Sequence, residues 1–155
     1  MKFIKTTALL AILFSFVLVS CEKDAENKKV TLYLKTGIIM SSAQENPPNS
    51  STATGTIDVA YDKKTKLLSY TIKYSGLTGA PTAAHIHGLA PQGYTIGVVQ
   101  NFNGFPTTTA GTYTNSLLAD GVYIKEDDIL NGMYYANIHT AANPGGEIRG
   151  QIKFQ

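Results

Sequence analysis

Apolar and polar residues alternate along most of the chain from residue 30 onward, which is the pattern of β-strands that bury one face. Because successive side chains of a strand point to opposite faces, the apolar set of each stretch is expected to face a shared core. Further strands are expected over residues 84–88, 96–102, 110–118 and 133–139. The clearest alternating sets are Val30, Leu32 and Leu34; Ile57, Val59 and Tyr61; Leu68, Tyr70, Ile72 and Tyr74; and Ile148, Gly150, Ile152 and Phe154.

Turn and loop residues separate these stretches. Prolines and polar residues interrupt the pattern at residues 45–51, and the polar segment 62–65 joins the second and third strands as a hairpin. Residues 125–131 favour one short helix, which ends at Gly132. About seven or eight short strands without a βαβ pattern predict one all-β domain, an antiparallel β-sandwich or flattened Greek-key barrel of the immunoglobulin or superoxide dismutase type.

The first twenty residues do not continue this pattern. Two lysines precede a nearly uniform apolar run over residues 8–19, which is too short to span a bilayer. Leu18 and Ser20 then stand at the positions before Cys21 that direct lipidation in bacterial lipoprotein signals, and Cys21 is the single cysteine of the chain. Residues 1–20 are therefore expected to be a signal peptide, and Cys21 is expected to carry the lipid (palmitate) that anchors the protein to a membrane.

Residues 22–29 are charged and lack apolar periodicity, which is typical of a solvated tether, so the folded domain is expected over residues 30–155. The chain has 13 basic and 11 acidic residues, and removal of Lys2 and Lys5 with the signal peptide leaves equal numbers. A neutral domain has no electrostatic basis for binding nucleic acid. We expect an exported bacterial lipoprotein anchored at the cell envelope, in the outer membrane with its domain on the periplasmic side or at the cell surface.

All three histidines of the chain lie in two short motifs. His85 and His87 are separated by one residue, so a strand would place both rings on one face and the intervening residue in the core. His139 would share a face with Asn137 on a second strand, and its ring would complete a site of three nitrogen ligands. Imidazole nitrogen suits copper or zinc, so one such ion is the candidate cofactor if the three rings converge. The alternative is that the rings are hydrogen-bonded polar residues that stabilise a strand end and the turn at residues 143–146.

Glu147 and Arg149 alternate with Ile148 in the last strand, so both are expected on the face away from the core. As functional residues, Glu147 would accept a hydrogen bond that orients a histidine, and Arg149 would hold an anion or a carboxylate. The alternative is a cross-strand ion pair on the sheet surface, which contributes little stability. The sequence contains no Gly-x-Ser-x-Gly motif and no carboxylate pair suited to glycoside hydrolysis, so no catalytic residue is assigned.

Three longer motifs resemble the CHRD family, whose domain is repeated in chordin and occurs singly in bacterial exported proteins. The matching segments are residues 42–48 (SAQENPP), residues 70–77 followed by 83–88 (AAHIHG), and residues 135–152, which contain NIHTAANPGGEIRG. The resemblance covers residues 30–155. It implies a binding module, since the animal domain belongs to an extracellular antagonist of growth factors. We expect a protein or glycan partner, with exposed tyrosines such as Tyr94 on the binding surface.

A weaker similarity is to the copper half of Cu/Zn superoxide dismutase, itself an antiparallel sandwich. By position, His85, His87 and His139 match three copper ligands, and Arg149 matches the arginine that guides the anionic substrate. The sequence lacks the loop with the bridging histidine and zinc ligands, a fourth copper histidine and the disulfide cysteines, so a dinuclear dismutase site is excluded. Three functions stay open: a lipid-anchored module that binds a metal, a copper-dependent redox enzyme using the same residues, and an adhesion module without metal.

Overall fold

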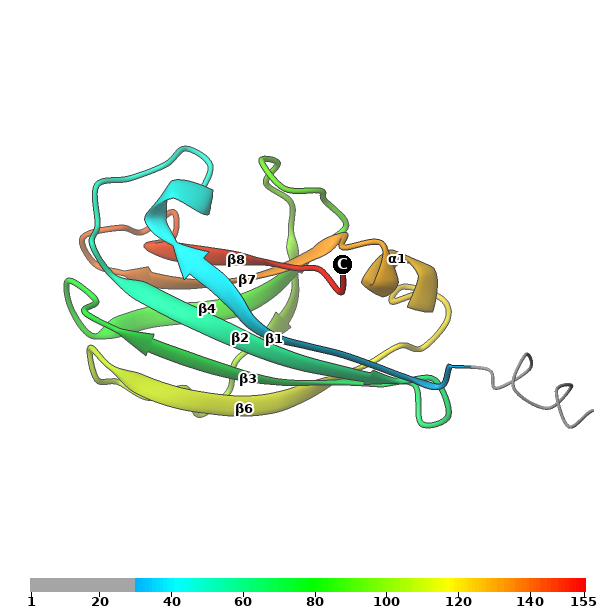
Figure 1. Cartoon of the computed structure of the whole chain (residues 1–155). Helices are drawn as coiled ribbons and strands as arrows, with labels where there is room; N and C mark the ends of the chain where they lie inside the picture. Colours follow the sequence, from blue (N-terminus) through cyan, green and yellow to red (C-terminus); the bar gives the residue numbers. More distant parts are fainter. Residues whose placement is uncertain (1–29) are drawn as a thin grey trace, which may run out of the picture.

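Eight antiparallel strands form one sheet in the computed structural model, which describes residues 30–155 (Figure 1). Residues 1–29, with the expected signal peptide, lipidated Cys21 and tether, lie outside the described residues. The strands are ordered β5-β4-β7-β8-β1-β2-β3-β6 across the sheet. A 3₁₀ turn, η1 (Ser42–Gln44), follows β1, and a helix, α1 (Glu126–Leu130), precedes β7. The strand bounds are β1 Leu32–Ser41, β2 Thr54–Asp62, β3 Leu67–Ser75, β4 Pro81–Gly88, β5 Val98–Asn101, β6 Gly111–Leu118, β7 Tyr134–Thr140 and β8 Ile148–Ile152.

The sheet is nearly closed into a flattened barrel. Its edge strands β5 and β6 approach each other, and the Gln100 side chain donates a hydrogen bond to the Ser116 carbonyl oxygen at 2.8 Å. The predicted all-β antiparallel class is confirmed, and α1 lies within the predicted helical segment 125–131. None of the helices in residues 30–155 has the length and apolar character needed to cross a membrane.

The core lies on the inner face of the sheet, where alternation places the apolar side chains of most strands. The predicted inward sets of β2 and β3 are buried, and these two strands form the predicted hairpin, with Asp62 paired with Leu67. Three isoleucines from the other half of the sheet, Ile86, Ile138 and Ile148, are fully buried in the same cluster. The burial of these isoleucines decides which face of β4, β7 and β8 is turned outward.

The prediction of which face of the first strand points toward the core is wrong. Val30, Leu32 and Leu34 are 58%, 50% and 63% exposed. Tyr33, predicted to face outward, packs against the core instead, with its ring centre 6.1 Å from that of Phe154. Large apolar or amphipathic side chains occupy both faces of this strand, so periodicity alone does not decide which face is buried.

A bulge then resets the alternation within β1. The pairing with β2 shifts between Lys35 and Ile38, around Gly37, whose φ of +66° favours glycine. Beyond the bulge, Ile38 packs against the core and Met40 is fully buried. The two ends of β1 therefore both contribute to the core, although the residues between them break the period of two.

Two loops cover the outer face of β7 and β8. The segment after β1 and the segment 89–97 after β4 meet on this side of the sheet, where the Asn46 side chain donates a hydrogen bond to the Gly93 carbonyl oxygen at 2.9 Å (Figure 1). Every residue of β8 is buried as a result, including the outward-facing Arg149 and Gln151. The strand expected over residues 96–102 is shorter, Val98–Asn101, because the residues before it belong to this covering loop.

Candidate metal centre

Neighbouring strands bring all three histidines to the outer face of the sheet. His85 in β4 is directly opposite Asn137 in β7, and His139 follows two residues later on the same face of β7. Ile86, which separates His85 from His87, is fully buried. The predicted arrangement, with the polar residues of both motifs on one face, is confirmed.

The three rings converge. One ring nitrogen from each histidine lies within 4.8 Å of the other two, and His85 Nδ1 is 3.2 Å from His139 Nε2. A tetrahedral zinc ion with bonds of about 2.0–2.1 Å to nitrogen holds its ligand atoms roughly 3.3 Å apart. The separation of His85 and His139 matches this value, whereas the third ring would have to move closer by up to about 1.5 Å to share such an ion. His87 is buried, whereas the other two rings are partly accessible.

Backbone carbonyls determine which nitrogen carries the proton in two of the rings. His87 Nδ1 is 2.8 Å from the Ile96 carbonyl oxygen, and His139 Nδ1 is 2.9 Å from that of Pro144. Because a carbonyl oxygen only accepts hydrogen bonds, both Nδ1 atoms donate. When these two rings are neutral, the Nε2 atoms of His87 and His139 carry a lone pair directed into the polar cluster. Metal-binding histidines in proteins are commonly oriented by such a partner on the second nitrogen.

The surroundings favour the neutral form of two of the rings. Burial, together with the neighbouring His139 and His87, lowers the pKa of His85 to about 4. Burial also lowers the pKa of His139, against the opposing effect of its hydrogen bond with Pro144. Protons therefore compete weakly with a metal ion for these nitrogens near neutral pH.

Asn137 and Glu45 complete the polar cluster, although the sequence pattern does not predict either as a site residue. Asn137 Oδ1 lies 3.1 Å from His87 Nε2 and 3.0 Å from His139 Nε2. The Glu45 carboxylate, directly after η1, lies close enough to Arg149 and Asn137 for both to lower its pKa, against the larger effect of burial. The available signal for Glu45 was its place as the acidic residue of the motif at 42–48.

Glu45 makes the stability of the fold depend on pH. Burial raises its pKa to about 7, although Arg149 and Asn137 act in the opposite direction. Between the ordinary value of 4.5 and 7, the folded protein binds a proton that the unfolded chain releases. This stabilisation is complete below the unfolded pKa and is lost as the pH rises through 7. We expect Glu45→Gln to raise the free energy of unfolding of metal-free protein by about 1–3 kcal/mol at about pH 8, with little change at about pH 4.5.

Urea unfolding of the full-length protein, with a chelator present, measures this difference. Glu126→Gln is a control of opposite sign, because a hydrogen bond from Lys63 lowers the pKa of Glu126. That substitution should remove stability at the higher pH. A Glu45→Gln effect of the same size at both pH values would contradict the raised pKa of Glu45.

Arg149 lies beneath the covering loop. Its guanidinium is 3.4 Å from the centre of the Tyr135 ring, whose other neighbour is the His87 ring, stacked with centres 4.7 Å apart. Its two Nη atoms donate to the Tyr94 carbonyl oxygen and to the Gln151 side-chain oxygen, and the residue is 1% exposed. The guanidinium is thus engaged inside the protein, where its charge acts on the Glu45 carboxylate, and the role of Arg149 in guiding an anion stays a prediction. The Tyr94 side chain, by contrast, is 66% exposed.

Glu147 belongs to a separate hydrogen-bond cluster. Its carboxylate accepts hydrogen bonds from the Ser51 hydroxyl at 2.7 Å, from the Thr78 backbone N–H at 2.8 Å and from the Thr140 hydroxyl. These contacts contradict the expectation that Glu147 orients a histidine. Its complete burial equally contradicts a surface ion pair with Arg149. Glu147 instead joins the loops before β2 and β4 to the end of β7.

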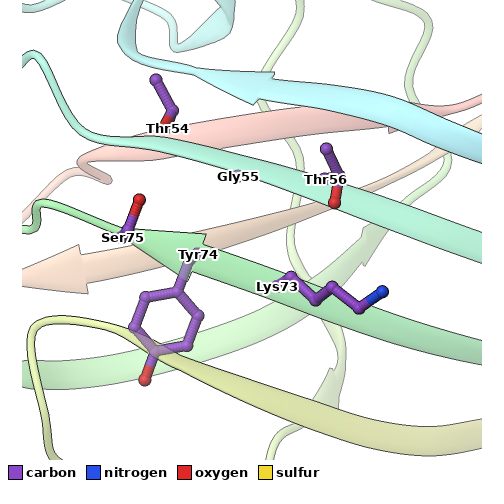
Figure 2. Close-up of a pocket in the computed structure, with 6 residues that line it drawn as sticks. All are labelled: Thr54, Gly55, Thr56, Lys73, Tyr74 and Ser75. Atoms are coloured by element: carbon purple, nitrogen blue, oxygen red, sulfur yellow. The ribbon is translucent and has the colours of Figure 1, made fainter.

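The surface hollow in Figure 2 lies on β2 and β3 and is formed by different residues. Its one charged side chain is Lys73, whose Nζ lies 3.7 Å from the Asp58 carboxylate. Among the described residues, no histidine, cysteine or carboxylate lines this hollow, so it offers no set of ligands for a transition metal. Its lining consists of Thr54, Gly55, Thr56, Lys73, Tyr74 and Ser75 (Figure 2).

A family model described as the CHRD domain matches residues 36–152. This span includes the three histidines, Asn137 and Glu45. Searches of curated proteins and of solved structures found no significant match.

Proposed function

The chain belongs to the CHRD domain family, and we propose that it is a binding module of the cell envelope that holds one transition-metal ion between His85, His87 and His139. Copper and zinc are the favoured ions, because imidazole nitrogen suits both. The motif ending at Cys21 supports a lipid anchor for the module.

The main observation in favour of the metal site is that several hydrogen-bond acceptor atoms converge there, with too few hydrogen-bond donors to satisfy them. His87 Nε2 and His139 Nε2 both face Asn137 Oδ1, which is itself an acceptor. The N–H of His85 can satisfy one of them, His139 Nε2, at 3.2 Å. Acceptors that face one another in a low-dielectric site repel, and a cation between them turns this repulsion into attraction. The cluster therefore favours a cation site over a purely structural set of hydrogen bonds.

A binding role is better supported than copper redox catalysis on the same residues. Dismutation of superoxide needs a path for the anion, and the Arg149 guanidinium that would guide it is engaged by Tyr94 and Gln151. We expect copper-loaded protein to show no superoxide dismutation above that of free buffer components. Sustained dismutation by the loaded protein would support the enzyme instead.

Equilibrium titration tests the metal site. A chelator first removes bound metal from the full-length protein in detergent. One sample is then titrated with Zn²⁺, and a second sample is titrated with Cu²⁺. We expect one ion per chain; binding through His85 Nδ1 moves the proton of this neutral ring to its Nε2 atom, so little proton release is expected near neutral pH. A protein that retains neither metal would overturn the proposal.

The lipid anchor has its own test. Cys21→Ser removes the thiol that would carry the lipid. We expect the variant to move from the membrane fraction to the soluble fraction, with membrane association reduced more than about tenfold. Continued membrane association of the variant would contradict anchoring through Cys21.

A further inference from the structure

The Asn137 side chain has an orientation that a three-histidine site does not explain. Its oxygen faces His87 Nε2 at 3.1 Å and His139 Nε2 at 3.0 Å. An amide turned the other way would donate one N–H to each of these two lone pairs. The hydrogen bonds of the histidines alone would therefore favour the opposite orientation.

A cation accounts for the observed orientation. An oxygen directed at two histidine lone pairs repels them, whereas all three atoms can ligate one positive ion. Glu45 lies nearby, is 7% exposed, and has an Oε1 atom without a hydrogen-bond partner. Gly146 makes room for this carboxylate, because a Cβ at this position would overlap it.

The oxygen also lies where a fourth ligand belongs. Its distances to the two Nε2 atoms nearly equal the 3.2 Å between His85 Nδ1 and His139 Nε2. These three separations are close to the roughly 3.3 Å edge of a tetrahedron around a zinc ion, and the histidine nitrogens, which lie within 4.8 Å of one another, would draw together on binding. We propose that Asn137 Oδ1 is the fourth ligand of the metal ion. This inference rests on the proposed metal site and makes it a closed site of three nitrogens and one oxygen.

A closed site, in which the protein supplies every ligand, favours retention of the ion over catalysis. Catalytic zinc sites keep one position for water or substrate, whereas a site with four protein ligands retains the ion. The four ligands here are neutral, so the ion keeps its full charge, and the Glu45 carboxylate behind Asn137 offsets part of that charge. The arrangement suits binding or storage of a divalent ion, with no vertex left for an external ligand.

Cobalt(II), which adopts the geometry of zinc sites and absorbs visible light, distinguishes a closed site from an open one. We expect azide to leave the visible spectrum of the cobalt-loaded full-length protein unchanged. In Asn137→Ala, water takes the fourth position, so azide should shift the spectrum, and cobalt affinity should fall about 10–100-fold. Asn137→Asp keeps an oxygen ligand and should restore both the affinity and the indifference to azide.

Gln151→Ala is the matched control. Gln151 is a buried amide on the neighbouring strand, and it donates to the carbonyl oxygens of Ala90 and Gly132 and not to a histidine. Its loss should lower stability without creating a response to azide. A wild-type spectrum that shifts with azide, or an Asn137→Ala variant with unchanged cobalt affinity, would overturn the fourth ligand and leave the three-histidine site standing. A wild-type protein that takes up no cobalt would refute the metal site itself.

Discussion

Replacing His139 by alanine should lower the affinity of the protein for zinc more than about 100-fold, since even residues behind the ligands contribute 10–100-fold. His139 Nε2 lies at the centre of the cluster, 3.2 Å from His85 Nδ1, and the Pro144 carbonyl holds its ring in place. The ring is partly accessible and lies outside the apolar core, so the fold should be retained. Competition between the full-length protein and a chromophoric chelator measures the affinity.

Asn143→Ala is a suitable control in the same turn. Asn143 bonds Thr140 through its backbone, so removal of its side chain should leave zinc affinity unchanged. The far-ultraviolet circular dichroism of both variants should match that of the wild type. Equal zinc affinities for His139→Ala and the wild type would show that the histidines act as structural polar residues.

Replacing Ile138 by alanine should lower the free energy of unfolding by about 2–5 kcal/mol. Ile138 is fully buried on the face opposite Asn137 and His139, so its loss leaves a cavity beneath the site. A loss of this size is a large part of the roughly 5–15 kcal/mol that stabilises a typical domain. Chemical unfolding of the full-length protein measures it.

Ile39→Ala provides the same substitution on the opposite face. Ile39 lies in β1 and is 65% exposed, so its replacement should change the free energy of unfolding by less than about 0.5 kcal/mol. Comparable losses in the two variants would contradict the assignment of inner and outer faces.

The histidine-bearing strands could be predicted from the sequence because alternation is a local property. His85 and His87 flank one buried isoleucine, and Asn137 and His139 flank another, so these isoleucines decide where the polar side chains point. The pairing of β4 with β7 is not local, since it brings together rings 54 residues apart in sequence. The only hint of this pairing in the sequence was that all three histidines lie in strand motifs.

The rest of the site depends on contacts outside the strands. Alternation places Arg149 on the outer face, but the loop at 89–97 buries that face and turns the residue into an internal hydrogen-bond donor. Glu45 lies in a segment without periodicity, where no sequence pattern indicates its direction. Its contact with Asn137 arises because the segment after β1 folds back over β7 and β8. Even within strands, β1 shows that a bulge and a distant partner, Phe154, can override the period of two.

Anomalous scattering from crystals of the zinc-loaded protein tests the central claim most directly. We expect one peak at the zinc absorption edge, about 2.0–2.1 Å from a ring nitrogen of each of His85, His87 and His139. A peak at any other position, or no peak in protein equilibrated with zinc, would contradict the metal centre.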